Sequence, residues 1–367
     1  MDTIQKKTTT AAGEFVSLAG ERYYAIHDVD KIAPFFISVI SDSDHWLFVS
    51  STGGLTAGRV SPETALFPYI TVDKIHESAA NTGSKTLLRV DTQDGCHYWE
   101  PFNREHDDRF SVSRHLYKNV LGNKICFEEI NHDLQLAFRY TWMSSDSYGF
   151  VRQCEFHNQG DKSVSVDLLD GLQNILPADT PLSAQTNSSN LVDAYKWSEL
   201  DEQTGMAFFT LYSGIADRAE PYESLKASTV FCLGLESPTI LLCSDQLDGF
   251  RRGEPIQQEL LKRGVRGAYL VNARLELAPG SSQCWQLVAN IQQSQGQAVE
   301  LRRQLGEPLK VAETITQSVN KGNDRLARIV ASADGFQVTA EETVSAHHYA
   351  NTVFNVLRGG IFDDQYQ

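Results

Sequence analysis

The sequence predicts a mainly β protein, a large antiparallel sandwich of two layers followed by a C-terminal helical linker. Apolar and polar residues alternate over most of residues 23–291, which is the pattern of strands with one buried face. Short stretches rich in turn-forming residues separate these runs, and the near absence of helical interludes argues against alternating strands and helices. After residue 292 the apolar spacing becomes helical. We therefore expect a lead-in at 1–22, a sandwich at 23–292 and a helical linker at 293–367.

Within the sandwich, residues 134–142 form the clearest predicted strand because their apolar side chains fall on alternate positions. Two further stretches, 151–170 and 269–291, predict hairpins, since each carries a cluster of turn-forming residues near its centre. The polar stretch 179–190 is predicted to be a loop. Continuous apolar runs predict strands buried on both faces at residues 35–40, 46–49, 206–212, 230–235 and 240–243.

The linker is predicted to contain two helices. Val311, Ile315 and Val319 are spaced four residues apart, which places them on one face of a helix at 309–332. A second helix is expected at 341–357, where two glycines follow as a stop signal. Because apolar residues continue into the last residues, we expect the chain to be a piece of a longer protein.

Composition and charge exclude several classes of partner. Hydrophobic residues make up 41% and charged residues 22% of the 367 residues, as in soluble globular proteins. Thirty-two Lys and Arg against forty-seven Asp and Glu give a net charge of −15, which repels nucleic acid and anionic lipid. No apolar run has the length of a signal peptide or a membrane span. We expect a cytoplasmic protein that binds neither nucleic acid nor membrane.

No metal site is predicted. The six cysteines are widely spaced and form no CxxC pair, so buried reduced thiols are expected instead of zinc ligands. His347 and His348 are adjacent on a predicted helix, where neighbours point about 100° apart, and they make a poor metal pair.

The early motif at Gly53, Gly54 and Arg59 raises the question of a phosphate-binding loop. It lacks the spacing of a P-loop and of a dinucleotide-binding turn, and no strand-to-helix switch surrounds it. One interpretation is a tight bend between two strands, where glycine permits positive φ. The other is a loop whose backbone approaches a sugar or a partner domain.

A second candidate lies at Trp99 and Glu100, which follow Tyr98. Aromatic rings stack on the CH-rich faces of sugars while carboxylates bind hydroxyls, so this pairing suits a carbohydrate ligand. Trp and Tyr are, however, more often ordinary residues of a core or its rim than sugar-binding residues.

Clustered charges elsewhere give no catalytic assignment. Glu128 and Glu129 are neighbours on a predicted strand and point to opposite faces, so they cannot flank one glycosidic oxygen together. We expect at least one of them to face solvent. The stretches 105–109 and 114–115 are interpreted as solvated charge clusters.

Several of these segments resemble the N-terminal sandwich of glycoside phosphorylases in family 94 of the glycoside hydrolases, which includes cellobiose phosphorylase-like enzymes. The similarity covers about residues 23–358 and includes the strand order and the helical linker. The matching motifs are Ser51-Thr52-Gly53-Gly54 before Arg59, Tyr98-Trp99-Glu100-Pro101, Arg114-His115 leading to Phe127-Glu128, and the turn at Pro279-Gly280.

The resemblance implies a galactose mutarotase-like super-sandwich, a linker and then an (α/α)6 barrel. In such enzymes the barrel carries the catalytic aspartate and the phosphate-binding residues, and inorganic phosphate is the co-substrate for inverting cleavage of β-glycosides. No residue here matches those catalytic positions, so none is assigned, and no cofactor is expected. A supporting role at a sugar site or a dimer interface is implied for Gly53, Gly54, Arg59, Trp99 and Glu100, although the early motif continues as Leu-Thr-Ala-Gly-Arg and not as the family's glycine- and aromatic-rich run.

Three functions remain open at this point. The leading hypothesis is a noncatalytic module that binds a sugar or oligosaccharide and serves a missing (α/α)6 catalytic domain. A stand-alone aldose 1-epimerase is the first alternative, and it needs a general acid and base, typically histidine and glutamate. A purely structural module that pairs with a second copy is the other. The histidines available to an epimerase are His97, His106, His115, His132 and His157, and no spacing selects among them.

Overall fold

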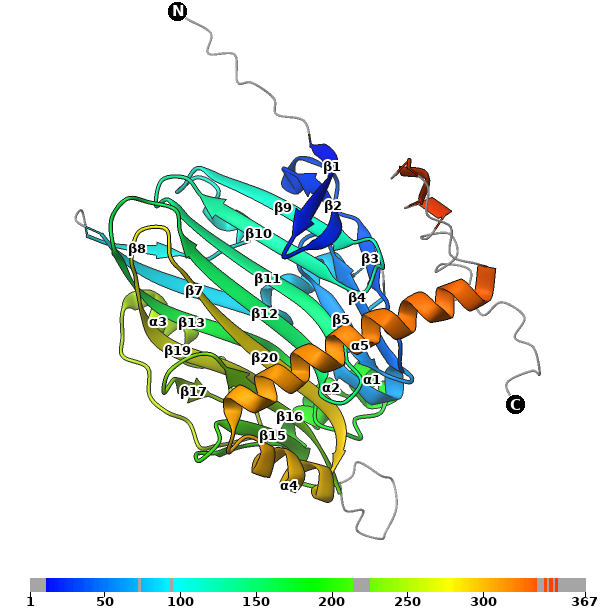
Figure 1. Ribbon diagram of the computed structural model, residues 1–367. Coiled ribbons are helices and arrows are strands. Elements are labelled where there is room, and N and C mark those ends of the chain that lie inside the picture. The colour runs from blue at the N-terminus through cyan, green and yellow to red at the C-terminus, as the bar shows by residue number, and fades with distance from the viewer. Residues whose placement is uncertain are drawn as a thin grey trace, which may run out of the picture.

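The computed structural model describes residues 11–71, 74–92, 95–213, 225–334, 340–341, 343–345 and 347–348. Strands in this part of the chain form three antiparallel sheets (Figure 1). The largest has eleven strands. Their order across the sheet is β1 (Ala12–Leu18), β2 (Glu21–His27), β9 (Val112–Asn119), β10 (Ile125–Asn131), β11 (Leu136–Ser145), β12 (Gly149–Asn158), β20 (Ser282–Ser294), β16 (Lys226–Leu233), β15 (Met206–Leu211), β14 (Lys196–Asp201) and β18 (Leu261–Arg263).

Two smaller sheets pack against the large one. A five-stranded sheet has the order β17 (Thr239–Leu241), β19 (Gly267–Leu277), β13 (Val164–Ile175), β7 (Gly83–Thr92) and β8 (Gly95–Trp99). A four-stranded sheet has the order β3 (Phe36–Val39), β4 (His45–Ser50), β5 (Leu55–Arg59) and β6 (Ala65–Phe67).

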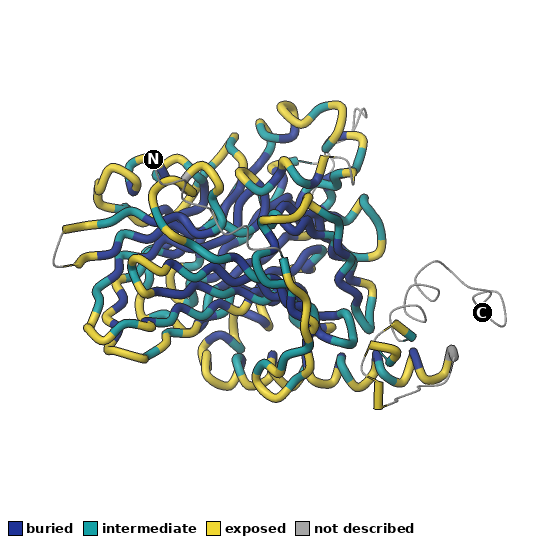
Figure 2. The backbone as a smooth tube through the Cα atoms, turned by 90° about the horizontal axis from the view of Figure 1, so that it is seen from above, coloured by how far each residue is buried: buried dark blue, intermediate teal, exposed yellow. Residues whose placement is uncertain are grey.

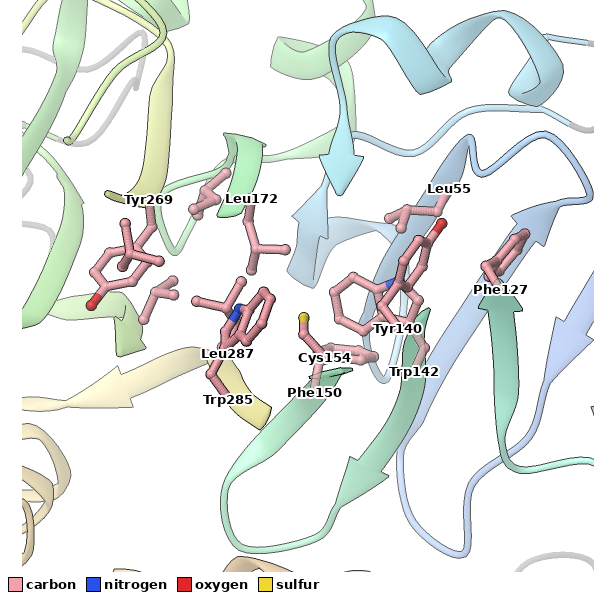
Figure 3. Close-up of a cluster of buried hydrophobic side chains, with 14 of the residues drawn as sticks. Leu55, Phe127, Tyr140, Trp142, Phe150, Cys154, Leu172, Tyr269, Trp285 and Leu287 are labelled. Carbon is pink, nitrogen blue, oxygen red and sulfur yellow. The ribbon is translucent and has the colours of Figure 1, made fainter. Parts of the chain in front are cut away.

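One hydrophobic core joins all three sheets. Trp142 and Trp285 from the large sheet, Tyr269 from the five-stranded sheet and Leu55 from the four-stranded sheet belong to the same buried cluster (Figure 3). Buried residues are concentrated in the interior, and many of the exposed ones lie at the periphery (Figure 2). The predicted class, a mainly β antiparallel sandwich, is confirmed, and the five apolar runs expected to be strands overlap β3, β4, β15, β16 and β17. Pairing begins earlier than expected, because β1 lies within the predicted lead-in.

Both predicted hairpins are wrong. β12 and β13 lie in different sheets, and so do β19 and β20, so each connection crosses from one layer to the other. Alternation of apolar residues shows that one face is buried, but strands of both layers bury a face against the same core. The Nδ2 atom of Asn158 joins the two crossings, since it donates to the carbonyl oxygens of Lys162 at 2.8 Å and of Leu277 and Ala278 at 3.2 Å.

Short helices occupy the connections. They are η1 (Val29–Lys31), η2 (Pro62–Thr64), η3 (Ile75–Ala80), η4 (Arg104–His106), α1 (Leu182–Asn187), α2 (Ser189–Tyr195) and α3 (Leu247–Arg252). The prediction of a loop at 179–190 is wrong, because α1 and the start of α2 fall there. α1 buries only Ala184 and α2 only Val192, and both side chains pack in a cluster with Leu211. One buried apolar residue per helix is too few to give a periodic pattern in the sequence.

The C-terminal part is helical, as predicted. α4 (Gln295–Gln304) begins with a capping box in which Ser294 and Gln297 exchange hydrogen bonds. α5 (Pro308–Asp334) confirms the predicted helix and lies across the outer face of the large sheet, where Ile315 and Val319 join a buried cluster with Val151 (Figure 1). Most of the helix predicted at 341–357 lies outside the described residues. Among the helices in the described ranges, none has both the length and the apolar character that a bilayer crossing requires.

Candidate functional site

Gly53 and Gly54 form the turn between β4 and β5, as the first interpretation of the motif predicted. Gly53 has φ of +91°, a conformation that favours glycine, and its N–H donates to the carbonyl of Ser50 at 2.8 Å. Gly54 packs so closely on η3 that an added Cβ would lie 2.0 Å from the carbonyl oxygen of Ile75. The two glycines therefore allow the turn to approach the start of η3 backbone to backbone.

This turn forms one wall of a cleft of about 560 Å³. The other walls come from η3, the start of β7, the segment that follows β8, and α3. The lining includes Gly53, His76, Lys85, Glu100, Phe102 and Arg251. A second cleft of about 580 Å³ lies between the large sheet and α5, but none of the five residues singled out from the sequence lines it. The cleft of about 560 Å³ is the candidate site, because Gly53 and Glu100, two of the five residues singled out from the sequence, line it.

Glu100 organises the charges of this cleft. Its side chain accepts a hydrogen bond from the hydroxyl of Tyr98 at 2.5 Å and pairs with Lys85, and Arg251 Nη2 lies 3.4 Å from its Oε2. Burial by itself raises the pKa of Glu100, but Lys85, the hydroxyl of Tyr98 and Arg251 together hold the pKa below its ordinary value. Glu100 is therefore an ionised anchor that fixes two cations in the wall of the cleft.

Trp99 points the other way, into the core. Adjacent strand residues face opposite sides, and Trp99 is only 1% exposed, with its indole N–H donating to Oε1 of Glu129 at 2.8 Å. Its ring has no free face for a sugar, which corrects the stacking role considered from the sequence. It contributes indirectly, because Glu129 also accepts the backbone N–H of Phe102 at 2.6 Å and so holds that residue, a lining residue, in place.

Arg59 is not part of the cleft. It ends β5, five residues beyond Gly54 and roughly 16 Å away along an extended strand. There its Nε donates to Oδ1 of Asp44 at 2.8 Å. Gly53 and Glu100 thus line the same cleft. Gly54 lies in the same turn but packs against η3, and Gly54, Arg59 and Trp99 are not lining residues.

The expectation that Glu128 or Glu129 faces solvent is wrong, although they do point to opposite faces of β10. Glu128 is 6% and Glu129 1% exposed. Both faces of β10 are covered, and each carboxylate is paired with an arginine, Glu128 with Arg139 and Glu129 with Arg114. Arg114 is itself buried, and it also pairs with Asp107. The prediction that Arg114 belongs to a solvated charge cluster is therefore wrong.

A buried ion pair lies beneath the cleft. Arg152 on β12 and Asp170 on β13 are fully buried, with 2.8 Å between Nη1 and Oδ2. Asp170 also accepts from the hydroxyl of Thr86, a lining residue, at 2.6 Å. The guanidinium of Arg152 lies over the ring of Tyr140, another lining residue, at 4.6 Å from its centroid. The floor of the cleft is therefore fixed to a contact between the two layers.

Sequence reasoning missed three lining residues. Lys85 and Arg251 reach Glu100 from 15 and 151 residues away, and no local pattern announces such a meeting. His76 was not among the histidines considered, yet its Nδ1 lies 2.6 Å from Oγ of buried Ser50. Four of the histidines that were considered lie outside the lining, namely His97, His115, His132 and His157, and the side chain of His106 lies outside the described part.

The cleft therefore combines ionic groups that neutralise one another with hydrogen-bonding groups and the ring of Phe102. Glu100 pairs with both Lys85 and Arg251, and Asp248 pairs with Arg251 as well, so two carboxylates compensate the two cations and leave no strong positive field for a phosphate. Such a lining suits a neutral ligand with many hydroxyls, because hydroxyls both donate and accept hydrogen bonds.

No protein-family model and no curated protein matches this sequence. Among solved structures, a bacterial glucoamylase in complex with acarbose has 9% identity and a TM-score of 0.45, over 86% of this chain and 40% of that chain. A protein from the human microbiome assigned as a kojibiose phosphorylase has 9% identity and a TM-score of 0.40, over 72% and 30%. One from Escherichia coli K12 assigned as an aldose 1-epimerase has 12% identity and a TM-score of 0.33, over 71% and 99%. This chain thus spans less than half of the first two proteins, and at these values the likenesses assign neither a family nor an activity.

Proposed function

We propose that this chain is a sugar-binding β-sandwich module and that the cleft between the β4–β5 turn and the segment after β8 is its binding site. The observation that carries the proposal is the anchored wall formed by Glu100, Lys85 and Arg251 in a cleft of about 560 Å³. Small-molecule sites typically measure about 300 to 1,000 Å³ and carry a few well-placed polar groups.

A neutral sugar fits this wall better than a nucleotide or a sugar phosphate. Lys85 and Arg251 both pair with Glu100, so an anionic ligand would have to compete with a carboxylate that is already in place. The net charge of −15 adds long-range repulsion of anions. A pyranose would hydrogen-bond to the free hydrogens of Lys85 and Arg251 and contact the ring of Phe102.

The finer part of the proposal is a noncatalytic role beside a separate catalytic domain. It rests on the motifs that resemble the N-terminal sandwich of family 94 glycoside phosphorylases. By that resemblance, the partner is an (α/α)6 barrel, inorganic phosphate is the co-substrate of the whole enzyme, and Gly53 and Glu100 support the sugar site. A homodimer is the other partner the resemblance offers.

Binding is tested by calorimetric titration of the chain with cellobiose, glucose and galactose. We expect Lys85→Gln to weaken binding about two- to twelvefold, the range for losing one hydrogen bond. Arg59→Gln is the matched control, because Arg59 is a partly exposed cation outside the cleft, and it should bind like the wild type. Equal affinities for all three proteins would refute the site, and an absence of any sugar binding would favour a purely structural module.

Catalysis is tested separately. We expect no sugar phosphate when the chain is incubated with cellobiose and inorganic phosphate, and release of glucose phosphate would contradict the noncatalytic role.

An aldose 1-epimerase is the second candidate, favoured by one observation. His76 lines the cleft together with the carboxylates Glu77 and Glu105, so an imidazole and acids do meet there. Polarimetry of freshly dissolved glucose and galactose decides the point. If the wild type accelerates mutarotation and His76→Asn does not, the chain is an epimerase and the proposal of a noncatalytic binding module is wrong.

A further inference from the structure

His76 takes part in a closed ring of three contacts beside the cleft. Its Nδ1 lies 2.6 Å from Oγ of Ser50, and that Oγ lies 2.7 Å from Oγ1 of Thr52. The ring closes because Oγ1 of Thr52 lies 3.2 Å from the carbonyl oxygen of His76. Ser50 is fully buried, so its hydroxyl has no water to bind in place of these partners.

The hydrogens of this ring can be assigned by counting. A carbonyl oxygen only accepts, so the single hydroxyl hydrogen of Thr52 goes to the carbonyl of His76. Oγ1 of Thr52 must then accept from Ser50, which uses the only hydroxyl hydrogen of Ser50. Oγ of Ser50 is left as an acceptor towards Nδ1 of His76, and Nδ1 must carry the hydrogen. The second lone pair of Ser50 accepts the backbone N–H of Thr52 at 3.1 Å, so the serine oxygen is fully used.

We propose that this ring holds neutral His76 as the Nδ1–H tautomer and that the lone pair of Nε2 accepts a hydrogen bond from a hydroxyl of the ligand in the cleft. The tautomer of a histidine is set by the hydrogen bond that its other nitrogen makes. His76 lines the cleft, and its Nε2 has no hydrogen-bond partner among the described residues. The ligand part of this proposal rests on the proposed function, whereas the tautomer does not.

The acceptor would complement the rest of the wall. Lys85 and Arg251 offer only donors, and both carboxylate oxygens of Glu100 already have donors. Nε2 of His76 would add an acceptor to this part of the wall, which the exposed carboxylates of Glu77 and Glu105 also line. The cleft could then both donate hydrogen bonds to a sugar and accept one from it.

The tautomer is measured by nitrogen NMR on protein labelled with ¹⁵N-histidine, about two pH units above the ordinary histidine pKa. The His76 signals are identified by their loss in His76→Asn. We expect a protonated Nδ1 and an unprotonated Nε2 in the wild type. Thr52→Val removes the acceptor that fixes the hydrogen of Ser50, so Nε2 should become protonated in at least part of that variant. A protonated Nε2 in the wild type would overturn the inference.

The ligand contact is measured by titration with cellobiose. In His76→Asn the side-chain amide takes the place of Nδ1 and still donates to Ser50, but the acceptor at Nε2 is gone. We expect about two- to twelvefold weaker binding, with an unchanged melting temperature. The control is His157→Asn, because His157 also bonds a serine hydroxyl, that of Ser282, but lies outside the cleft.

Wild-type affinity in His76→Asn would overturn the acceptor role even if the tautomer is as expected. If the wild type binds no sugar, the proposed function fails together with the ligand contact, and the NMR result still decides whether the ring holds the tautomer.

Discussion

The buried pair of Arg152 and Asp170 offers the sharpest test of how the two layers are held together. The perturbation is Asp170→Asn, which keeps the size of the side chain and removes its charge. Oδ1 and Oδ2 of Asp170 lie 2.9 and 2.8 Å from Nη1 of Arg152, and Oδ2 accepts the indole N–H of Trp285 at 2.7 Å. An asparagine can still accept from Trp285, but its amide group then faces the guanidinium donor to donor.

The expected cost is about 3 to 5 kcal/mol, the range for removing one partner of a buried ion pair. Neither side chain is exposed at all, so solvent screening does not reduce this figure. Burial by itself lowers the pKa of Arg152, but the neighbouring Asp170 raises it above the ordinary value, so the guanidinium stays charged in the folded protein. In the variant a charge therefore remains buried without a counter-charge.

The measurement is urea unfolding followed by tryptophan fluorescence and circular dichroism, with melting temperature as a second readout. At roughly 1.5 °C per kcal/mol for a chain of this length, the melting temperature should fall by about 4 to 8 °C. The double variant Arg152→Met with Asp170→Leu removes both charges, and it should be more stable than Asp170→Asn alone. A loss below about 1 kcal/mol in Asp170→Asn, or a double variant that is less stable than the single one, would refute the reasoning.

Three further predictions follow from burial and backbone geometry. Burial lowers the pKa of His45 to about 4, so the unfolded chain binds a proton before the folded one, and the free energy of unfolding should fall by up to about 3 kcal/mol as pH drops from about 6.5 towards 4; urea midpoints of His45→Leu should lack this component. Ile315→Ala on the buried face of α5 should cost about 2 to 5 kcal/mol in urea unfolding, whereas Leu309→Ala, at an 83% exposed position of the same helix, should cost almost nothing. Gly54→Ala should lower the melting temperature and weaken sugar binding together, because the new Cβ would press on the carbonyl of Ile75, and normal binding would contradict the role of this turn.

The strands were predictable where one face is buried, and the layers were not. The alternation in residues 134–142 predicts β11 because its buried face is continuous. The same signal in β12 and β13 does not reveal that they belong to different sheets, because the core lies between those sheets and is buried from both sides. The turn-forming residues near the centre of 151–170 do separate two strands, but only long-range pairing shows that the connection crosses to the other layer instead of closing a hairpin.

The site was predictable only where the cause is local. One of the two interpretations of the early motif allowed positive φ at Gly53 and Gly54 because they follow a strand, and Gly53 has positive φ whereas Gly54 does not. The pattern around Trp99 and Glu100 shows that they face opposite sides, but which side becomes core depends on Glu129, thirty residues away. His76 could not be selected at all, because its significance comes from a hydroxyl 26 residues earlier in the chain.

Asn158 joins the β12–β13 and β19–β20 connections, both of which pass from one sheet to the other. Its side-chain amide bonds the two connections at which the chain changes layer, so we expect the two sheets to open together while these hydrogen bonds are intact. Native-state hydrogen exchange should accordingly find the amides of β12, β13, β19 and β20 in one cooperative unit with a shared opening free energy. In Asn158→Ala the amides of β12 and β20 should exchange with a different opening free energy from those of β13 and β19.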